Sequence, residues 1–120
     1  MIGSIVYDRP FRCRKTRTLR TYGATHYVLS ADRPKLRIGR AADNDITIEQ
    51  DLVSRYHADV SLRGDKFFLA DTSTNGTYLR TDTGEVSRVS REAVTLGGSG
   101  RILPGAENVE PILYRMVRAG

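Results

Sequence analysis

Short runs of alternating apolar and polar residues follow one another from about residue 18 onward. The alternation is clearest at 57–63, where Ala58, Val60 and Leu62 would share one face of a strand and polar residues the other. The turn-forming residues at 63–66 lead from this run into a second apolar one, which predicts a hairpin. The predicted strands are 18–22, 26–30, 36–40, 45–48, 57–63, 66–71, 77–80, 93–96, 101–103 and 112–117.

The order of these short strands predicts an all-β fold, an antiparallel β-sandwich or barrel. Glycines punctuate most of the boundaries between runs, and no apolar period of 3.6 residues lasts long enough for a helix of three turns. Residues 1–17 lack the alternation, and we expect them to form a basic linker or flexible N-terminal segment. Residues 18–120 are then expected to form one domain.

Composition supports a single globular domain. The chain has 120 residues, of which 39% are hydrophobic and 28% charged, and this length can bury a core without disulfides or metal. Its single cysteine, Cys13, cannot form an intramolecular bridge. The first residues do not resemble a signal peptide, and no apolar run approaches the roughly 18 residues of a membrane span. We therefore expect a cytoplasmic protein without membrane association.

The net charge of +5 is unevenly distributed along the chain. Residues 1–37 contain nine Lys and Arg against two Asp, and the stretch 9–20 contains six basic residues and no acidic one. Such a stretch suits either a solvated linker or an arm that binds nucleic acid. We favour the linker, because release of counterions gives any basic arm some weak affinity for polyanions. Nucleic acid is not an expected partner.

The segment DLVSRYHADV at 51–60 raises the question of catalysis, because Ser54 and His57 could form a nucleophile and its base. Ser54, however, does not lie in the Gly-x-Ser-x-Gly turn of many serine hydrolases. Two histidines 31 positions apart and one cysteine also lack the spacing of metal ligands. We expect no catalytic residue, no metal and no cofactor, and a structural role for His57.

Three predicted loops carry groups that can bind an anion. Arg40 follows a strand, Ser54 and Arg55 lie in the next loop, and Thr74-Asn75-Gly76 forms a third. Guanidinium groups bind phosphate oxygens through charge-assisted hydrogen bonds, and hydroxyl and backbone N–H groups can complete the shell. Asn-Gly favours a turn with positive φ, which would fix the third loop.

The spacing of these pieces resembles the forkhead-associated (FHA) domain. Its motif has Gly-Arg, then Ser-x-x-His, then Asp-x-x-Ser-x-Asn-Gly-Thr, and the chain has all three in LRIGRAADNDITI, DLVSRYHADVSL and FFLADTSTNGTYL. The resemblance covers about residues 18–117. It implies a β-sandwich of about eleven strands that binds phosphothreonine peptides through loops at one end. One departure lies in REAVTLGGSGRILPG, where Ser99-Gly100 replaces the Gly-Asp usual in the family.

The resemblance also implies a role for each matched residue. The residues expected to contact the phosphate or the peptide are Arg40, Ser54, Arg55, Thr74 and Asn75. Leu52 would face the third residue after the phosphothreonine, where a leucine suits an apolar partner. A structural role falls to Gly39, His57, Gly76 and Thr77, with His57 bracing the loops.

The function implied is a phosphothreonine-dependent binding module in signal transduction. A Ser/Thr kinase would create the ligand on another protein or on the same polypeptide, and binding would recruit or reposition whatever is attached to the domain. The alternative is an FHA fold used for phosphorylation-independent contacts or dimerisation. The run VSRVSREAVTL at 86–96 and the Gly-Ser-Gly turn at 98–100 are similar to those of FHA domains found after class III adenylate or guanylate cyclase domains in bacteria. An attached enzyme of this kind is therefore expected, although the domain itself is expected not to be an enzyme.

Overall fold

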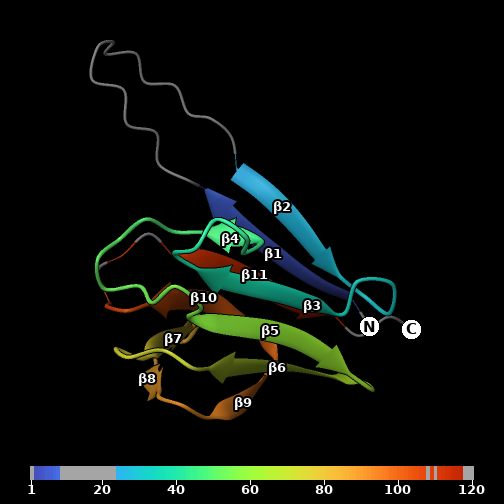
Figure 1. Cartoon of the computed structure of the whole chain (residues 1–120). Helices are drawn as coiled ribbons and strands as arrows, with labels where there is room; N and C mark the ends of the chain where they lie inside the picture. The colour runs from blue at the N-terminus through green and yellow to red at the C-terminus, as the bar shows by residue number, and fades with distance from the viewer. Residues whose placement is uncertain (1, 9–23, 108, 110, 118–120) are drawn as a thin grey trace, which may run out of the picture.

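The computed structural model describes residues 2–8, 24–107, 109 and 111–117, which form eleven strands in two sheets (Figure 1). One sheet has the order β4 (Ile46–Thr47), β3 (Lys35–Gly39), β5 (Ala58–Arg63), β6 (Lys66–Asp71) and β9 (Ala93–Leu96). The other has the order β2 (Ala24–Leu29), β1 (Ile2–Asp8), β11 (Ile112–Val117), β10 (Gly98–Pro104), β7 (Thr77–Thr81) and β8 (Val86–Val89). The predicted all-β sandwich is confirmed.

The core lies between the two sheets because each strand turns alternate side chains inward. Leu36, Ile38 and Val60 from the five-stranded sheet are fully buried, as are Ile102 and Ile112 from the other sheet. Each such side chain contributes roughly 1.5–3 kcal/mol of hydrophobic stabilisation. All pairings are antiparallel apart from the short one between β3 and β4.

The prediction that residues 1–17 form a linker is wrong for residues 2–8. These residues form β1, which lies between β2 and β11 and pairs with both. The alternation was hidden at Gly3, whose inward position is filled by Phe67: a Cβ on Gly3 would lie 2.8 Å from the Phe67 ring. The rest of the basic segment and the predicted strand at 18–22 lie outside the described residues.

The strand β8 was also not predicted. Three of its four side chains are exposed and only Val89 is buried, as suits a strand at the edge of a sheet. Such a strand leaves no apolar alternation in the sequence. The remaining predicted strands from residue 26 onward correspond to β2–β7 and β9–β11, with small differences at their ends.

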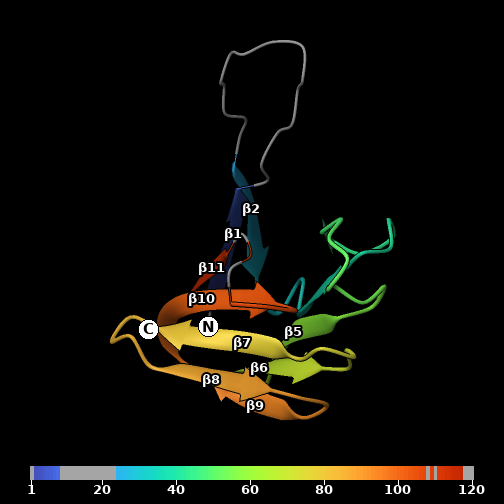
Figure 2. The same cartoon turned by 90° about the vertical axis from the view of Figure 1, so that its left-hand side faces the viewer.

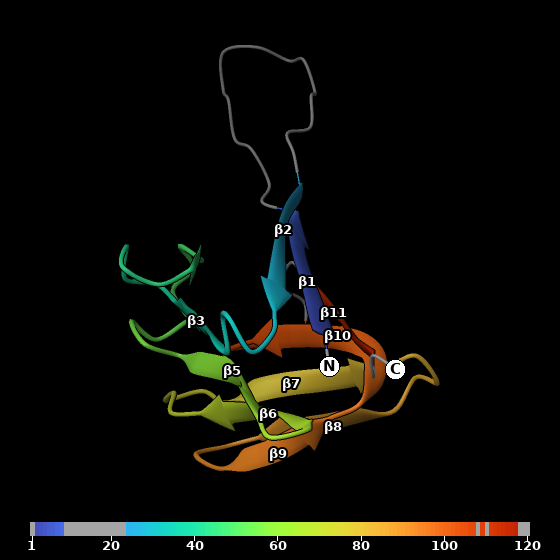
Figure 3. The ribbon, with the colours of Figure 1, turned by 90° about the vertical axis from the view of Figure 1, so that its right-hand side faces the viewer.

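The chain direction brings three loops to one end of the sandwich. Ile38 near the end of β3 and Asp71 at the end of β6 both pair with Ala58 at the start of β5. The loops 40–45, 48–57 and 72–76 therefore lie together, as Figure 2 shows from that end. The start of β1 pairs with the end of β11 at the other end, which Figure 3 faces. In the part of the chain that is described, no helix is long and apolar enough to span a membrane.

Candidate functional site

The loop after β3 is held against the loop before β5 by its backbone. Arg40 N–H donates to the carbonyl of Ser54 at 2.9 Å, and Ala41 N–H donates to the carbonyl of Arg55 at 3.2 Å. Gly39 permits this contact, because a Cβ there would overlap the Arg55 carbonyl oxygen. Its backbone is not in the left-handed region, so this glycine is required for close approach rather than for a turn.

Arg40 is exposed, and its guanidinium is positioned rather than free. Its Nε donates to the carbonyl of Val53 at 3.0 Å, which fixes the base of the guanidinium over the second loop. The two terminal nitrogens make no hydrogen bond within the described residues. Arg55 is exposed and its side chain has no hydrogen bond there either. Two cations at one end of the sandwich therefore have donors available for an anion.

Ser54 joins the second loop to the third. Its Oγ accepts the N–H of Thr74 at 3.1 Å, so the hydroxyl hydrogen is available to donate elsewhere. Asn75 makes a parallel contact, with Nδ2 donating to the carbonyl of Leu52 at 3.0 Å. Leu52 and Thr74 are exposed at this surface. The structure thus brings together the predicted residues of all three loops.

His57 is fully buried and connects the same two loops. Its Nδ1 accepts the N–H of Ser54 at 3.0 Å, so its Nε2 carries the hydrogen and donates to the carbonyl of Gly76 at 2.8 Å. Burial lowers the pKa of the imidazole, against the opposing effects of the Gly76 carbonyl and the Asp71 charge. The Asp71 carboxylate lies 3.9 Å from Nε2 and accepts hydrogen bonds from other donors, among them the Thr77 hydroxyl. The ring is therefore neutral and is no general base for Ser54.

The third loop is shaped by Asp71, which is buried at the end of β6. Its carboxylate accepts the hydroxyls of Ser73 at 2.7 Å and Thr77 at 2.6 Å, and the backbone N–H groups of Ser73 at 3.2 Å and Arg91 at 2.9 Å. Burial raises the pKa of this carboxyl, but the hydrogen bonds, led by that from Arg91, outweigh burial and hold the pKa below its usual value. Gly76 closes the loop at φ +87°, as the Asn-Gly pair predicted.

Three further residues support the site and were not among the predicted ones. Asn44 is buried, and its Nδ2 donates to the carbonyls of Ala41 and Arg55, both at 2.8 Å. Arg88 from β8 donates to the carbonyl of Asn75 at 3.1 Å, and Arg91 N–H completes the Asp71 cluster. Of these three, only Asn44 lies within the motif segments that carry the resemblance, in LRIGRAADNDITI. Arg88 and Arg91 could not be placed at the site without β8 and the turn that follows it.

The arrangement suits a doubly charged tetrahedral anion. It offers two guanidiniums and a serine hydroxyl whose hydrogen is free, and all of these can donate to an anion. It lacks a base that could activate Ser54, since His57 accepts from that residue's backbone N–H. No cluster of three or more His, Cys, Asp or Glu that could hold a metal ion occurs among the described residues.

Comparisons with known proteins agree on one family. The sequence model of the FHA domain matches residues 36–101. The FHA domain-containing protein FhaB of Mycobacterium tuberculosis is 38% identical over 82 residues, which are 68% of this chain and 50% of FhaB. The chain thus spans about half the length of the curated relatives it matches.

Solved structures show the same fold. The FHA-1 domain of Mycobacterium tuberculosis Rv1747 is 18% identical, with a TM-score of 0.68 over 98% of this chain and 97% of that one. Mycobacterium tuberculosis EmbR, in complex with a low-affinity phosphopeptide, is 25% identical, with a TM-score of 0.63 over 98% of this chain and 25% of that one.

Proposed function

Because the chain belongs to the FHA domain family, we propose that its three joined loops bind phosphothreonine in a partner protein or peptide. The observation that carries this proposal is the convergence of Arg40, Ser54 and Thr74 through direct hydrogen bonds. The phosphate carries about −1.5 to −2 charges at neutral pH and offers three strong acceptors. EmbR, which shares the fold, has been solved with a phosphopeptide.

Each residue has a role that its surroundings support. The free nitrogens of Arg40 and the guanidinium of Arg55 would bind phosphate oxygens, and the Ser54 hydroxyl would donate to a third. Thr74 would approach the phosphate or the methyl group of the phosphothreonine. The unused oxygen and second N–H hydrogen of Asn75 would hold the peptide backbone, and Leu52 would face the third residue after the phosphothreonine.

The domain would thereby couple phosphorylation by a Ser/Thr kinase to recruitment or repositioning of an attached protein. The domain itself is a binding module. The nature of the attached protein, for which the sequence indicates a nucleotide cyclase, stays a prediction, as does a cytoplasmic location.

A peptide-binding assay tests the proposal. Wild-type protein should bind peptides from a phosphothreonine library at least tenfold more tightly than their unphosphorylated twins, because charge-assisted hydrogen bonds contribute roughly 1.5–3 kcal/mol each. Arg40→Ala and Ser54→Ala should lose most of this difference. Arg63→Ala, at the opposite end of β5, removes an equal charge and should bind like wild type.

Two outcomes would overturn the proposal in different ways. Equal affinity for phosphorylated and unphosphorylated peptides would favour an FHA fold that makes phosphorylation-independent contacts. Phosphate-dependent binding that survives both Arg40→Ala and Ser54→Ala would place the site elsewhere.

A further inference from the structure

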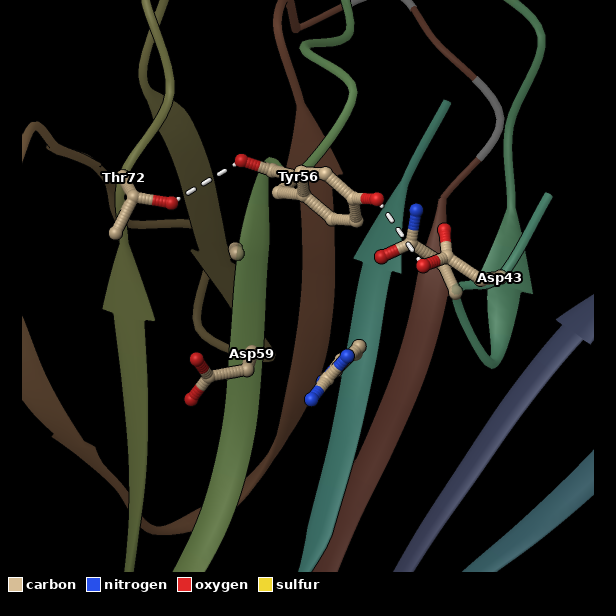
Figure 4. A pocket seen from close by; sticks show the side chains of 7 residues that line it. Asp43, Tyr56, Asp59 and Thr72 are labelled. Carbon is tan, nitrogen blue, oxygen red and sulfur yellow. Dashed lines mark hydrogen bonds between the residues drawn. The ribbon is translucent and has the colours of Figure 1, made fainter. Parts of the chain in front are cut away.

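A pocket lies beside the three loops, on the outer face of the sheet at β3 and β5 (Figure 4). Its volume is about 270 Å³. Tyr56 and Thr72 form part of its upper wall, Asp43 lies on the far side of the tyrosine ring, and Asp59 lies below on β5. None of these residues belongs to the proposed phosphate site, so the pocket has no role in the function described so far.

The pocket is rich in hydrogen-bond acceptors that lack a donor. Asp59 is half-buried, and its carboxylate has no hydrogen bond or ion pair among the described residues. Asn44 also lines the pocket and is 7% exposed, and its Oδ1 is buried without a partner while its Nδ2 is fully used. A buried acceptor without a donor costs roughly 1–3 kcal/mol. The half-buried carboxylate of Asp59 is the acceptor that a ligand could reach.

The charged residues that line the pocket are on balance negative. Asp43 and Asp59 contribute two carboxylates against the single guanidinium of Arg37, which also lines it. Arg37 pairs with Asp59 across the strands but makes no ion pair with it within the described residues. The Asp43 carboxylate accepts the Tyr56 hydroxyl at 3.0 Å, and this bond and the charge of Asp43 raise the tyrosine pKa in spite of Arg55 and Arg37. A cation fits these surroundings better than an anion does.

The pocket lies within a few residues' reach of the phosphate site. Tyr56 is two positions after Ser54, and Thr72 is two positions before Thr74. Extended chain advances about 3.3 Å per residue, so a peptide residue two or three positions from the phosphothreonine would span about 7–10 Å. Tyr56 and Leu52 lie on opposite sides of Ser54 along the loop. Since Leu52 is proposed to face the third residue after the phosphothreonine, the pocket would bind residues before it.

We infer that this pocket binds a lysine or arginine side chain two or three residues before the phosphothreonine. The inference rests on the proposed function. The basic side chain would donate to Asp59 and lie along the half-exposed Tyr56 ring, which also favours a cation. Phosphate bound at Arg55 would neutralise the positive charge that this residue places near Tyr56, so the two parts of the peptide would assist each other.

Binding of matched phosphopeptides tests the inference. The peptides differ only in having Arg, Lys, Ala or Glu at the second and third positions before the phosphothreonine, and affinity is measured by fluorescence anisotropy at 0.15 M salt. Wild-type protein should bind the Arg and Lys peptides about fivefold more tightly than the Ala peptide, as expected for a half-buried ion pair. Asp59→Asn should reduce this preference to less than twofold and leave affinity for the Ala peptide unchanged.

The controls separate this inference from the proposed function. Asp65→Asn, in the turn between β5 and β6 at the opposite end, removes an equal charge and should keep the preference; circular dichroism checks that both variants are folded. Equal binding of all four peptides, a preference for Glu, or a basic preference that survives Asp59→Asn would each overturn the pocket assignment. If the phosphorylated Ala peptide binds no better than its unphosphorylated twin, the proposed function itself fails.

Discussion

The buried imidazole of His57 offers the sharpest test of how the loops are held. Replacing it with phenylalanine keeps most of the volume and removes both ring nitrogens. The Ser54 N–H then loses its acceptor, while the Gly76 carbonyl keeps a second donor, the N–H of Gly105 at 3.0 Å. An unsatisfied N–H costs about 1–3 kcal/mol, and the lost bond to the carbonyl about 1 kcal/mol more. The free energy of unfolding should therefore fall by about 2–4 kcal/mol.

Urea unfolding followed by circular dichroism measures this loss. With a slope of about 2 kcal/mol per molar urea, in the middle of the range for a small protein, the midpoint should shift by roughly 1–2 M. The same change at the exposed His26, whose ring bonds the Ser4 hydroxyl and no other group among the described residues, should alter stability by no more than about 0.5 kcal/mol. A loss below about 1 kcal/mol for His57→Phe would mean that the ring fills space and does not brace the loops.

Three further outcomes follow from the same loops. Gly39→Ala should destabilise the fold by about 1–3 kcal/mol and weaken phosphopeptide binding, because the new methyl group would overlap the Arg55 carbonyl. Thermal unfolding measures the first effect and fluorescence anisotropy the second, and an unchanged melting temperature would contradict the close approach. Asp71→Asn should cost about 2–4 kcal/mol in thermal unfolding, because the amide NH₂ would face a hydrogen-bond donor, and a neutral result would show that the four bonds to this carboxylate are replaceable. Below about pH 6.5 His57 is protonated in the unfolded chain but not in the folded protein, where its pKa is lowered. The free energy of unfolding should therefore fall as pH decreases, by up to about 1.4 kcal/mol per pH unit, in urea titrations at pH 7.5, 6.0 and 5.0. His57→Phe should lose this part of the pH dependence.

The sequence predicted the strands wherever one face of a strand is buried. The run at 57–63 alternates strictly because Ala58 and Val60 face the core between the sheets. Alternation failed as a signal at β1, where a neighbouring ring fills the place of a side chain, and at β8, where most side chains face solvent. Both failures have one cause. Apolar alternation appears only where a strand buries its own side chains at regular positions, and neither of these two strands does so along its full length.

The loop residues could be predicted because they occur in a motif of fixed spacing, and the bonds among them could not. The sequence does not show that Ser54 Oγ accepts the backbone N–H of Thr74, twenty residues away. Nor does it show that the backbone N–H of Ser54 donates to the His57 ring. The pocket at Asp59 was equally hidden. It depends on which outward positions of β3 and β5 stand opposite each other, and this register appears only in the folded sheet.

The placement of the loops at one end, with the start of β1 and the end of β11 at the other, has a mechanical consequence. Tension between a bound ligand and whichever end of the chain is held would run roughly along the strands. The hydrogen bonds between β1 and β11, from Ile2 with Val117 to Tyr7 with Ile112, lie across that direction. Such a ladder is loaded in shear, with its bonds sharing the force instead of opening one after another. The sandwich should therefore resist tension in this direction better than tension that opens the ladder from one end.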